Sequence, residues 1–198
     1  MRSPLTPTRV IPVTSLTVPL PIDTLFDPER PLEIEIGCGK GRFLSARAAQ
    51  HPETQYLGIE RMLSRVAKLD KKAGRMKLDN LRILRLEAFY TFYYLLPAHR
   101  VRSVYVFFPD PWPKRHHHNR RLFSPLFLDA LWTRLEIGGT VQIATDHLDY
   151  FAEIYKAFAA DTRFKEVTPI PRLPHEQTDF ELIFRGQDRP IGACAYQV

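Results

Sequence analysis

Residues 107–121 (FFPDPWPKRHHHNRR) bring together side chains that can recognise a nucleotide. Asp110 lies between Pro109 and Pro111, and Trp112 follows directly. Because proline lacks a backbone N–H and restricts the residue before it, this pair should end the preceding apolar strand and fix the backbone around Asp110. The carboxylate can then meet a base edge at the strand tip, while the cations that follow hold phosphates. The cations of this tract include Lys114, Arg120 and Arg121.

The histidines and cysteines do not indicate a metal site. His116–His118 are consecutive in an expected loop, where they point in different directions and lack a partnering Cys or carboxylate pattern. Cys38 and Cys194 stand in no CxxC or CxxH pattern, so we expect two free thiols and neither a disulfide framework nor bound zinc.

Residues 35–41 (EIGCGKG) form a second group, with glycine at alternate positions. Because glycine has no Cβ, a ligand can approach the backbone of this turn closely. The spacing is GxGxG, one position short of the GxGxxG dinucleotide fingerprint, which disfavours NAD. Glu60, at the end of the next expected strand, can accept both hydroxyls of a ribose, and Glu87 can meet an adenine edge. An adenosine-bearing ligand without a pyrophosphate fits this pattern, and S-adenosylmethionine is the commonest one.

The elements that must position these groups alternate between strands and helices. Apolar runs and turn signals predict strands over residues 32–36, 56–59, 81–86, 101–108, 140–144, 164–168 and 180–184. Helices should follow the glycine turn, continue from Met62, begin at Ser124 with a stop at Gly138, and begin at Asp146 as a cap. This order predicts an α/β fold with a mostly parallel seven-stranded sheet and helices on both faces, the last two strands being antiparallel to each other.

Ligands of such a sheet bind beyond the carboxyl ends of its strands. Asp110, Asp146 and the glycine turn all fall at those ends, so we expect them to converge on one site.

Composition sets the remaining bounds. Residues 1–30 are rich in proline, which predicts a flexible arm before a single domain over residues 31–198. The net charge of +6 and the pI near 9.4 favour a polyanionic partner. No apolar run approaches the roughly 20 residues that a bilayer requires, and no signal-peptide pattern is evident, so we expect no membrane contact and a cytoplasmic location.

Taken together, residues 32–185 resemble the bacterial tRNA (guanine-N7-)-methyltransferase family, TrmB. The matching motifs are LEIEIGCGKG (32–41), GIE (58–60), FFPDPWPKRHHHNRRL (107–122), ATD (144–146) and TDFE (178–181). The resemblance implies a Rossmann-like class I methyltransferase that transfers a methyl group from S-adenosylmethionine to a guanosine in the tRNA variable loop.

The same resemblance implies roles for individual residues. Asp110 would be the catalytic carboxylate. The implied donor-binding residues are Glu35, Gly37, Gly39, Gly41, Glu60 and Glu87, and the implied substrate-binding residues are Lys114, Asp146, Thr178, Glu181, Arg120 and Arg121. Several positions depart from the family pattern. Arg115, His116 and Asn119 stand where the family has a lysine, an arginine and a lysine, and together these replacements lower the permanent charge of the basic loop. Glu87 is longer than the usual Asp or Asn, and Asp179 stands where lysine is common.

Guanine N7 carries a lone pair and no proton at neutral pH, so its methylation needs no general base. Alignment and a negative charge near the developing cation are what help, and an exposed aspartate, with a pKa of roughly 3.9, is ionised. Two other functions remain open at this point. An exocyclic-amine methyltransferase would carry a DPPY-like motif similar to residues 110–112, and a non-catalytic RNA-binding protein would keep the fold without binding the methyl donor.

Overall fold

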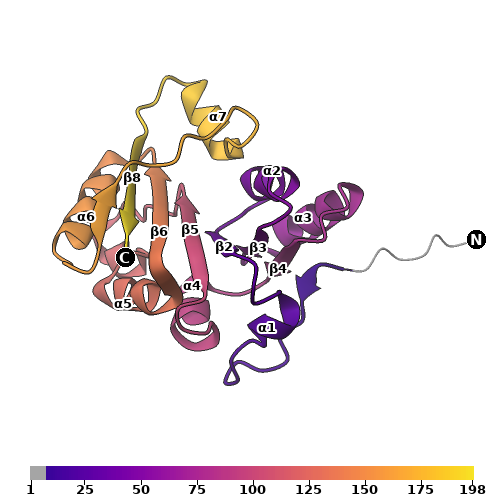
Figure 1. The fold of residues 1–198 in the computed structure, drawn as a ribbon. Helices are drawn as coiled ribbons and strands as arrows, with labels where there is room; N and C mark the ends of the chain where they lie inside the picture. The colour runs from indigo at the N-terminus through magenta and orange to yellow at the C-terminus, as the bar shows by residue number, and fades with distance from the viewer. Residues whose placement is uncertain (1–7) are drawn as a thin grey trace, which may run out of the picture.

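The central strands of the sheet are β2 (Leu32–Ile36), β3 (Gln55–Ile59) and β5 (Val101–Phe107), with β2 between the other two. The computed structural model describes residues 8–198, and Figure 1 shows their arrangement. The strand order is β1-β4-β3-β2-β5-β6-β8-β7, and β8 alone runs antiparallel, to both of its neighbours. The prediction of a mostly parallel α/β sheet is therefore confirmed.

The outer strands complete this sheet, and their bounds are Val10–Ile11 (β1), Leu81–Leu84 (β4), Leu135–Thr145 (β6), Lys165–Val167 (β7) and Gly192–Gln197 (β8). The α-helices are Ile22–Leu25 (α1), Arg42–Gln50 (α2), Leu63–Arg75 (α3), Ala88–Tyr90 (α4), Pro125–Arg134 (α5), Leu148–Ala159 (α6) and Asp179–Arg185 (α7). A π-helical turn covers Thr91–Leu95 (η1), and a 3₁₀ segment covers Arg115–Arg120 (η2).

Helices cover both faces of the sheet. Because side chains alternate along a strand, Tyr56 packs with α2 and α3 whereas Leu57 packs with the helices of the other face. The hydrophobic cluster on the face of Leu57 is larger than the one on the face of Tyr56. It includes residues of η1, α5 and α6, such as Phe92, Phe127 and Phe158. The prediction of helices on both faces is confirmed.

Residues 8–30 differ from the flexible arm that we expected. β1 pairs in parallel with β4 at the edge of the sheet, and apolar side chains that stand between the prolines are buried in the core. These side chains include Ile11, Leu20, Ile22 and Phe26. Proline disfavours the interior of a helix but is tolerated at a helix start and in an edge strand, so a proline-rich segment can still pack. Residues 1–7 of the expected arm lie outside the described residues.

The C-terminal part contains the main error in the expected elements. Residues 180–184 lie in helix α7 and not in a strand, and β8 occupies the place in the sheet between β6 and β7. Thr178 caps α7 because its Oγ1 accepts the Glu181 N–H at 3.0 Å. With β8 in place of the expected strand and β1 added at the edge, the sheet has eight strands where we expected seven.

Helix α5 begins as predicted, with Ser124 as its cap and Pro125 at its first position. It ends at Arg134, before Gly138, because β6 starts at Leu135. Across residues 8–198, none of the helices combines the length and the apolar character needed to span a bilayer.

Candidate active site

The glycine turn connects β2 to α2 as predicted. Gly37, Gly39 and Gly41 have φ values of 72°, 55° and 70°, a left-handed region that favours glycine. Their roles differ. A Cβ on Gly37 would meet nothing within 4 Å, which leaves that side of the turn open to a ligand. A Cβ on Gly41 would lie 2.2 Å from Leu69 Cδ1, so Gly41 allows α2 to pack against α3.

Glu60 follows β3 directly and is 5% exposed. Its Oε2 accepts the Gly39 N–H at 3.0 Å, and its Oε1 accepts the Met62 N–H at 2.9 Å. Arg65 of α3 lies 3.6 Å from Oε2. These contacts fix the carboxylate beside the glycine turn.

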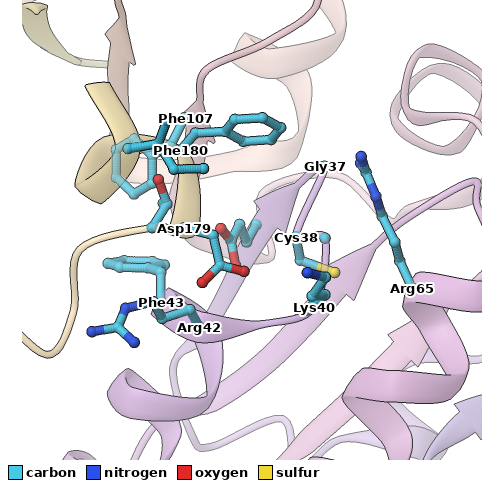
Figure 2. A pocket seen from close by; sticks show the side chains of 13 residues that line it. Gly37, Cys38, Lys40, Arg42, Phe43, Arg65, Phe107, Asp179 and Phe180 are labelled. Atoms are coloured by element: carbon cyan, nitrogen blue, oxygen red, sulfur yellow. The ribbon is translucent and has the colours of Figure 1, made fainter. Parts of the chain in front are cut away.

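A cavity of about 150 Å³ lies between the glycine turn and α7. Figure 2 shows the turn, with Cys38 and Lys40, on one side and Asp179 and Phe180 on the other. Its wall also includes Phe43 of α2 and Phe107, the last residue of β5. The β2–β5 pairing sets Ile36 opposite Val106, so the turn and the segment after β5 leave adjacent strands at one edge of the sheet. The strand order reverses between these two strands, which is where open α/β sheets bind ligands.

Glu35 lies in the wall of this cavity and is 3% exposed. Its Oε2 is buried without a hydrogen-bond partner. Burial raises the pKa of Glu35 to about 8, and the nearby charge of Glu60 adds to this rise. A buried carboxylate of this kind is suited to a cationic ligand group, because a cation would both supply a hydrogen-bond donor and favour the ionised form.

Glu87 does not line the cavity. It is exposed, three residues after the end of β4, where it caps α4 by accepting the N–H groups of Phe89 at 3.0 Å and Tyr90 at 2.7 Å. Its predicted contact with adenine stays a prediction.

Asp110 is exposed in the segment that continues from β5, three residues beyond the cavity residue Phe107. Phe108 and Trp112, on either side of the Pro-Asp-Pro unit, have left-handed φ values of 54° and 43°. Non-glycine residues pay for this conformation and keep it only where their surroundings hold them. The Phe108 ring packs 5.5 Å from the ring of Phe184 in α7, so the loop that presents Asp110 is anchored on α7.

Neighbouring arginines of the basic tract have different environments. Arg120 is exposed, and its guanidinium lies 4.9 Å from the centre of the Trp112 ring. Arg121 is 8% exposed, donates to the Pro111 carbonyl at 2.8 Å and pairs with Glu153 of α6. Lys114 is exposed at the start of η2. The guanidinium of Arg121 is thus buried against the loop and α6, and its predicted contact with substrate stays a prediction.

The remaining predicted substrate residues lie at the same edge of the sheet. Asp146 follows β6 and pairs with Arg189 at 2.8 Å. It does not cap α6 as we expected, since the cap is His147, whose Nδ1 accepts the Tyr150 N–H. Thr178 lines the cavity.

Glu181 is 1% exposed and pairs with Arg172 and Arg185, each at 2.9 Å. Burial opposes its ionisation, but these two arginines prevail and hold the pKa of Glu181 below its usual value. Its carboxylate secures α7 through these two pairs, and its predicted contact with substrate stays a prediction.

Sequence reasoning missed several residues of the cavity wall, chiefly Phe43, Asp179 and Phe180. A signal for the last two was present, because Thr178 and Glu181 form the S/T-x-x-E pattern of a helix start. In the structure, Asp179 and Phe180 are the first two residues of that helix and line the cavity.

The residues of this edge fit S-adenosylmethionine. Glu35 offers an unpartnered acceptor for the ammonium group, Glu60 is fixed where it can accept ribose hydroxyls, and the turn leaves room beside Gly37. The fold and this site define a class I methyltransferase that uses S-adenosylmethionine.

Comparison with known proteins specifies the family. Residues 29–184 match the family model described as "Putative methyltransferase". The chain is 40% identical over 167 residues to the tRNA (guanine-N(7)-)-methyltransferase of Halorhodospira halophila, which covers 81% of this chain and 71% of the relative. The enzyme of the same name from Chlorobium phaeobacteroides is 40% identical over 151 residues, with 76% and 72% covered. The chain therefore belongs to the tRNA (guanine-N(7)-)-methyltransferase family. It spans 53% of the longer relative from Nocardia farcinica.

Solved structures support the fold. The 16S rRNA methyltransferase KamB superposes with a TM-score of 0.67 at 16% identity, covering 89% of this chain and 91% of that one. An S-adenosylmethionine-dependent O-methyltransferase from Thermotoga maritima gives a TM-score of 0.58 at 14% identity, with 89% and 62% covered. At such low identities these likenesses show the fold alone.

Proposed function

We propose that the protein transfers the methyl group of S-adenosylmethionine to N7 of a guanosine in the variable loop of tRNA. The observation that carries the proposal is the juxtaposition of the donor cavity with the exposed Asp110 at the carboxyl ends of adjacent strands, in a chain of this family. A tRNA substrate also implies a cytoplasmic location.

The chemistry requires alignment more than proton transfer. S-adenosylmethionine supplies an electrophilic methyl group on a sulfonium. The N7 lone pair forms the new N–C bond, the electrons of the broken C–S bond go to sulfur, and the positive charge moves onto the purine. No proton leaves in this step, so the protein needs no general base.

Asp110 is suited to stabilise the purine as it becomes cationic. Its exposed carboxylate projects from a loop held by two prolines and by the packing of Phe108 on α7. The N1–H and the exocyclic amine of guanine can donate hydrogen bonds to a carboxylate. These bonds would orient the base. A fixed negative charge close to a developing cation lowers the barrier without reorganisation.

The surrounding residues would hold the RNA. Lys114 and Arg120 are exposed beside this loop and can contact phosphates. Thr178 lines the cavity and Asp146 follows β6 at the same edge of the sheet, where both would contact the base. Glu181 would act through α7, which it fixes by its two arginine pairs.

The decisive experiment maps the modified nucleotide. The protein is incubated with labelled S-adenosylmethionine and unmodified tRNA, and the product is treated with aniline, which cleaves RNA at N7-methylguanosine. Label in the variable loop together with cleavage at that nucleotide is the expected result. Label without cleavage would indicate methylation of an exocyclic amine, and RNA binding without label would indicate a non-catalytic protein. Either outcome overturns the proposal.

A further inference from the structure

A second carboxylate lines the donor cavity opposite the glycine turn. Asp179 is the first residue of α7, and its side chain lines the cavity across from Cys38 and Lys40 of the glycine turn (Figure 2). Glu181, two residues further on, differs because Arg172 and Arg185 engage its carboxylate. Asp179 is exposed and therefore remains open to a ligand in the cavity.

The cavity corresponds to one part of the methyl donor. Glu87, Glu60 and Glu35 lie at or beyond the ends of β4, β3 and β2, which are adjacent in this order. If Glu87 marks the adenine end and Glu60 the ribose, the amino-acid portion of the donor extends toward β2 and β5. The volume agrees, since about 150 Å³ is below the roughly 300 Å³ at which pockets begin to enclose a whole drug-sized ligand.

The charges around the cavity match that amino-acid portion. An ammonium group has three donors and no acceptor, so the buried Glu35 alone does not satisfy it. Asp179 supplies further acceptors from α7, across the cavity from the glycine turn. The negative charge of Asp179 also affects a partly buried group: burial lowers the pKa of Lys72, and the Asp179 carboxylate opposes this decrease. Lys40 and Arg42 are wall cations that can meet the donor carboxylate, and the Arg42 Nε donates to the Gln177 carbonyl at 2.9 Å. Arg65 also lies in the wall, where it pairs with Glu60.

We propose that Asp179 is a donor-binding residue that accepts a hydrogen bond from the ammonium group of S-adenosylmethionine and thereby links donor binding to the position of α7. The inference rests on the proposed function, since it presumes that this donor occupies the cavity.

A link between donor binding and α7 would affect the substrate site, because Thr178 caps α7 and Phe184 of α7 contacts the Asp110 loop. The loop before α7 is held on α2 by the Arg42–Gln177 hydrogen bond and by the Arg47–Glu176 pair at 3.3 Å. A bond from Asp179 to the donor would add a third attachment that exists only when the donor is bound. Thr178, next to Asp179, and the Phe108 contact with Phe184 would transmit it to the Asp110 loop.

Calorimetric titration with three ligands tests the proposal. S-adenosylmethionine and S-adenosylhomocysteine both carry the ammonium group, whereas 5′-methylthioadenosine lacks the whole amino-acid portion. Asp179→Asn should weaken binding of the first two by about tenfold, equivalent to about 1.4 kcal/mol, and leave the third unchanged. Asp179→Glu, which keeps the charge, should recover part of the affinity. Asp188→Asn is the matched control, because Asp188 is an exposed aspartate just after α7 and lies outside the cavity wall.

Each other outcome overturns the inference. Equal affinities of wild type and Asp179→Asn would exclude the contact. A loss confined to S-adenosylmethionine would assign Asp179 to the sulfonium, and an equal loss for 5′-methylthioadenosine would show an effect on the shape of the pocket. Failure of the wild-type protein to bind S-adenosylmethionine would instead refute the proposed function, so the two failures are distinguishable.

Discussion

The Oε2 atom of Glu60 accepts a hydrogen bond from the backbone N–H of Gly39 at 3.0 Å, which ties the end of β3 to the glycine turn after β2. A carboxylate has about four acceptor positions, and the N–H groups of Gly39 and Met62 use two of them. The same group that shapes the turn can therefore also bind the ribose hydroxyls of the donor.

Replacement of Glu60 should weaken donor binding more than it weakens the fold. In Glu60→Gln the amide nitrogen can no longer accept one of the two backbone N–H groups, and the negative charge is lost. We expect the affinity for S-adenosylmethionine to fall by about 30-fold, or about 2 kcal/mol, as measured by calorimetry. Glu53→Gln, at an exposed glutamate, is the control. Unchanged donor affinity in Glu60→Gln would exclude the ribose contact.

The raised pKa of Glu35 predicts proton release when the donor binds. In the free protein this pKa is about 8, so Glu35 is mostly protonated at pH 7. A bound ammonium group favours the ionised form and lowers the pKa, so a proton leaves on binding. The affinity therefore rises with pH up to about 8, above which Glu35 is already ionised in the free protein. Calorimetry at pH 7 in buffers of different ionisation enthalpy measures the released proton.

The amino group of the ligand itself titrates near pH 8, as α-amino groups do, so the pH dependence of the wild type alone is ambiguous. Glu35→Gln, titrated in the same buffers, isolates the contribution of Glu35. We expect weaker binding and no proton release in this variant. Equal proton release in both proteins would contradict the prediction.

The elements from β2 to α3 were predictable because local signals and tertiary packing agree there. The strand at residues 32–36 places Leu32, Ile34 and Ile36 in the core of one face, whereas Glu33 and Glu35 point to the other. The glycines that follow have the left-handed conformations that such a turn requires. The sequence therefore indicated both the turn and the acids beside it.

The C-terminal elements were not predictable from their apolar content. Phe180, Leu182 and Ile183 suggested a buried strand, yet they are 44%, 39% and 51% exposed on α7, close to the cavity and the Asp110 loop. Conversely, residues 192–197 (GACAYQ) have few strand-forming side chains, and their strand depends on pairing with β6 and β7. The burial of Arg121 likewise depends on Glu153, a residue of α6, so adjacent arginines of different burial look alike in the sequence.

Asp110 should be required for methyl transfer and not for donor binding, because it lies outside the cavity wall. Asp110→Asn keeps the size of the side chain but removes the charge that would stabilise the purine cation. We expect the single-turnover methylation rate to fall by about 100-fold, within the range found when one stabilising group of an active site is removed. The affinity for S-adenosylhomocysteine, measured by calorimetry, should stay within about twofold of the wild-type value. Parallel loss of rate and donor affinity would refute the role.

Arg120 and Arg121 should respond in opposite ways to replacement by alanine. Arg120 is exposed next to Trp112, so its loss should remove one phosphate contact and reduce the slope of log affinity against log salt by about 0.9. Arg121 is buried between the Pro111 carbonyl and Glu153, so its loss should lower the thermal midpoint and leave that slope unchanged. Fluorescence anisotropy with tRNA between about 50 and 200 mM salt measures the slopes, and circular dichroism measures unfolding. Each variant is the control for the other. A reduced slope in Arg121→Ala with an unchanged thermal midpoint would contradict this prediction and show that Arg121 contacts the RNA.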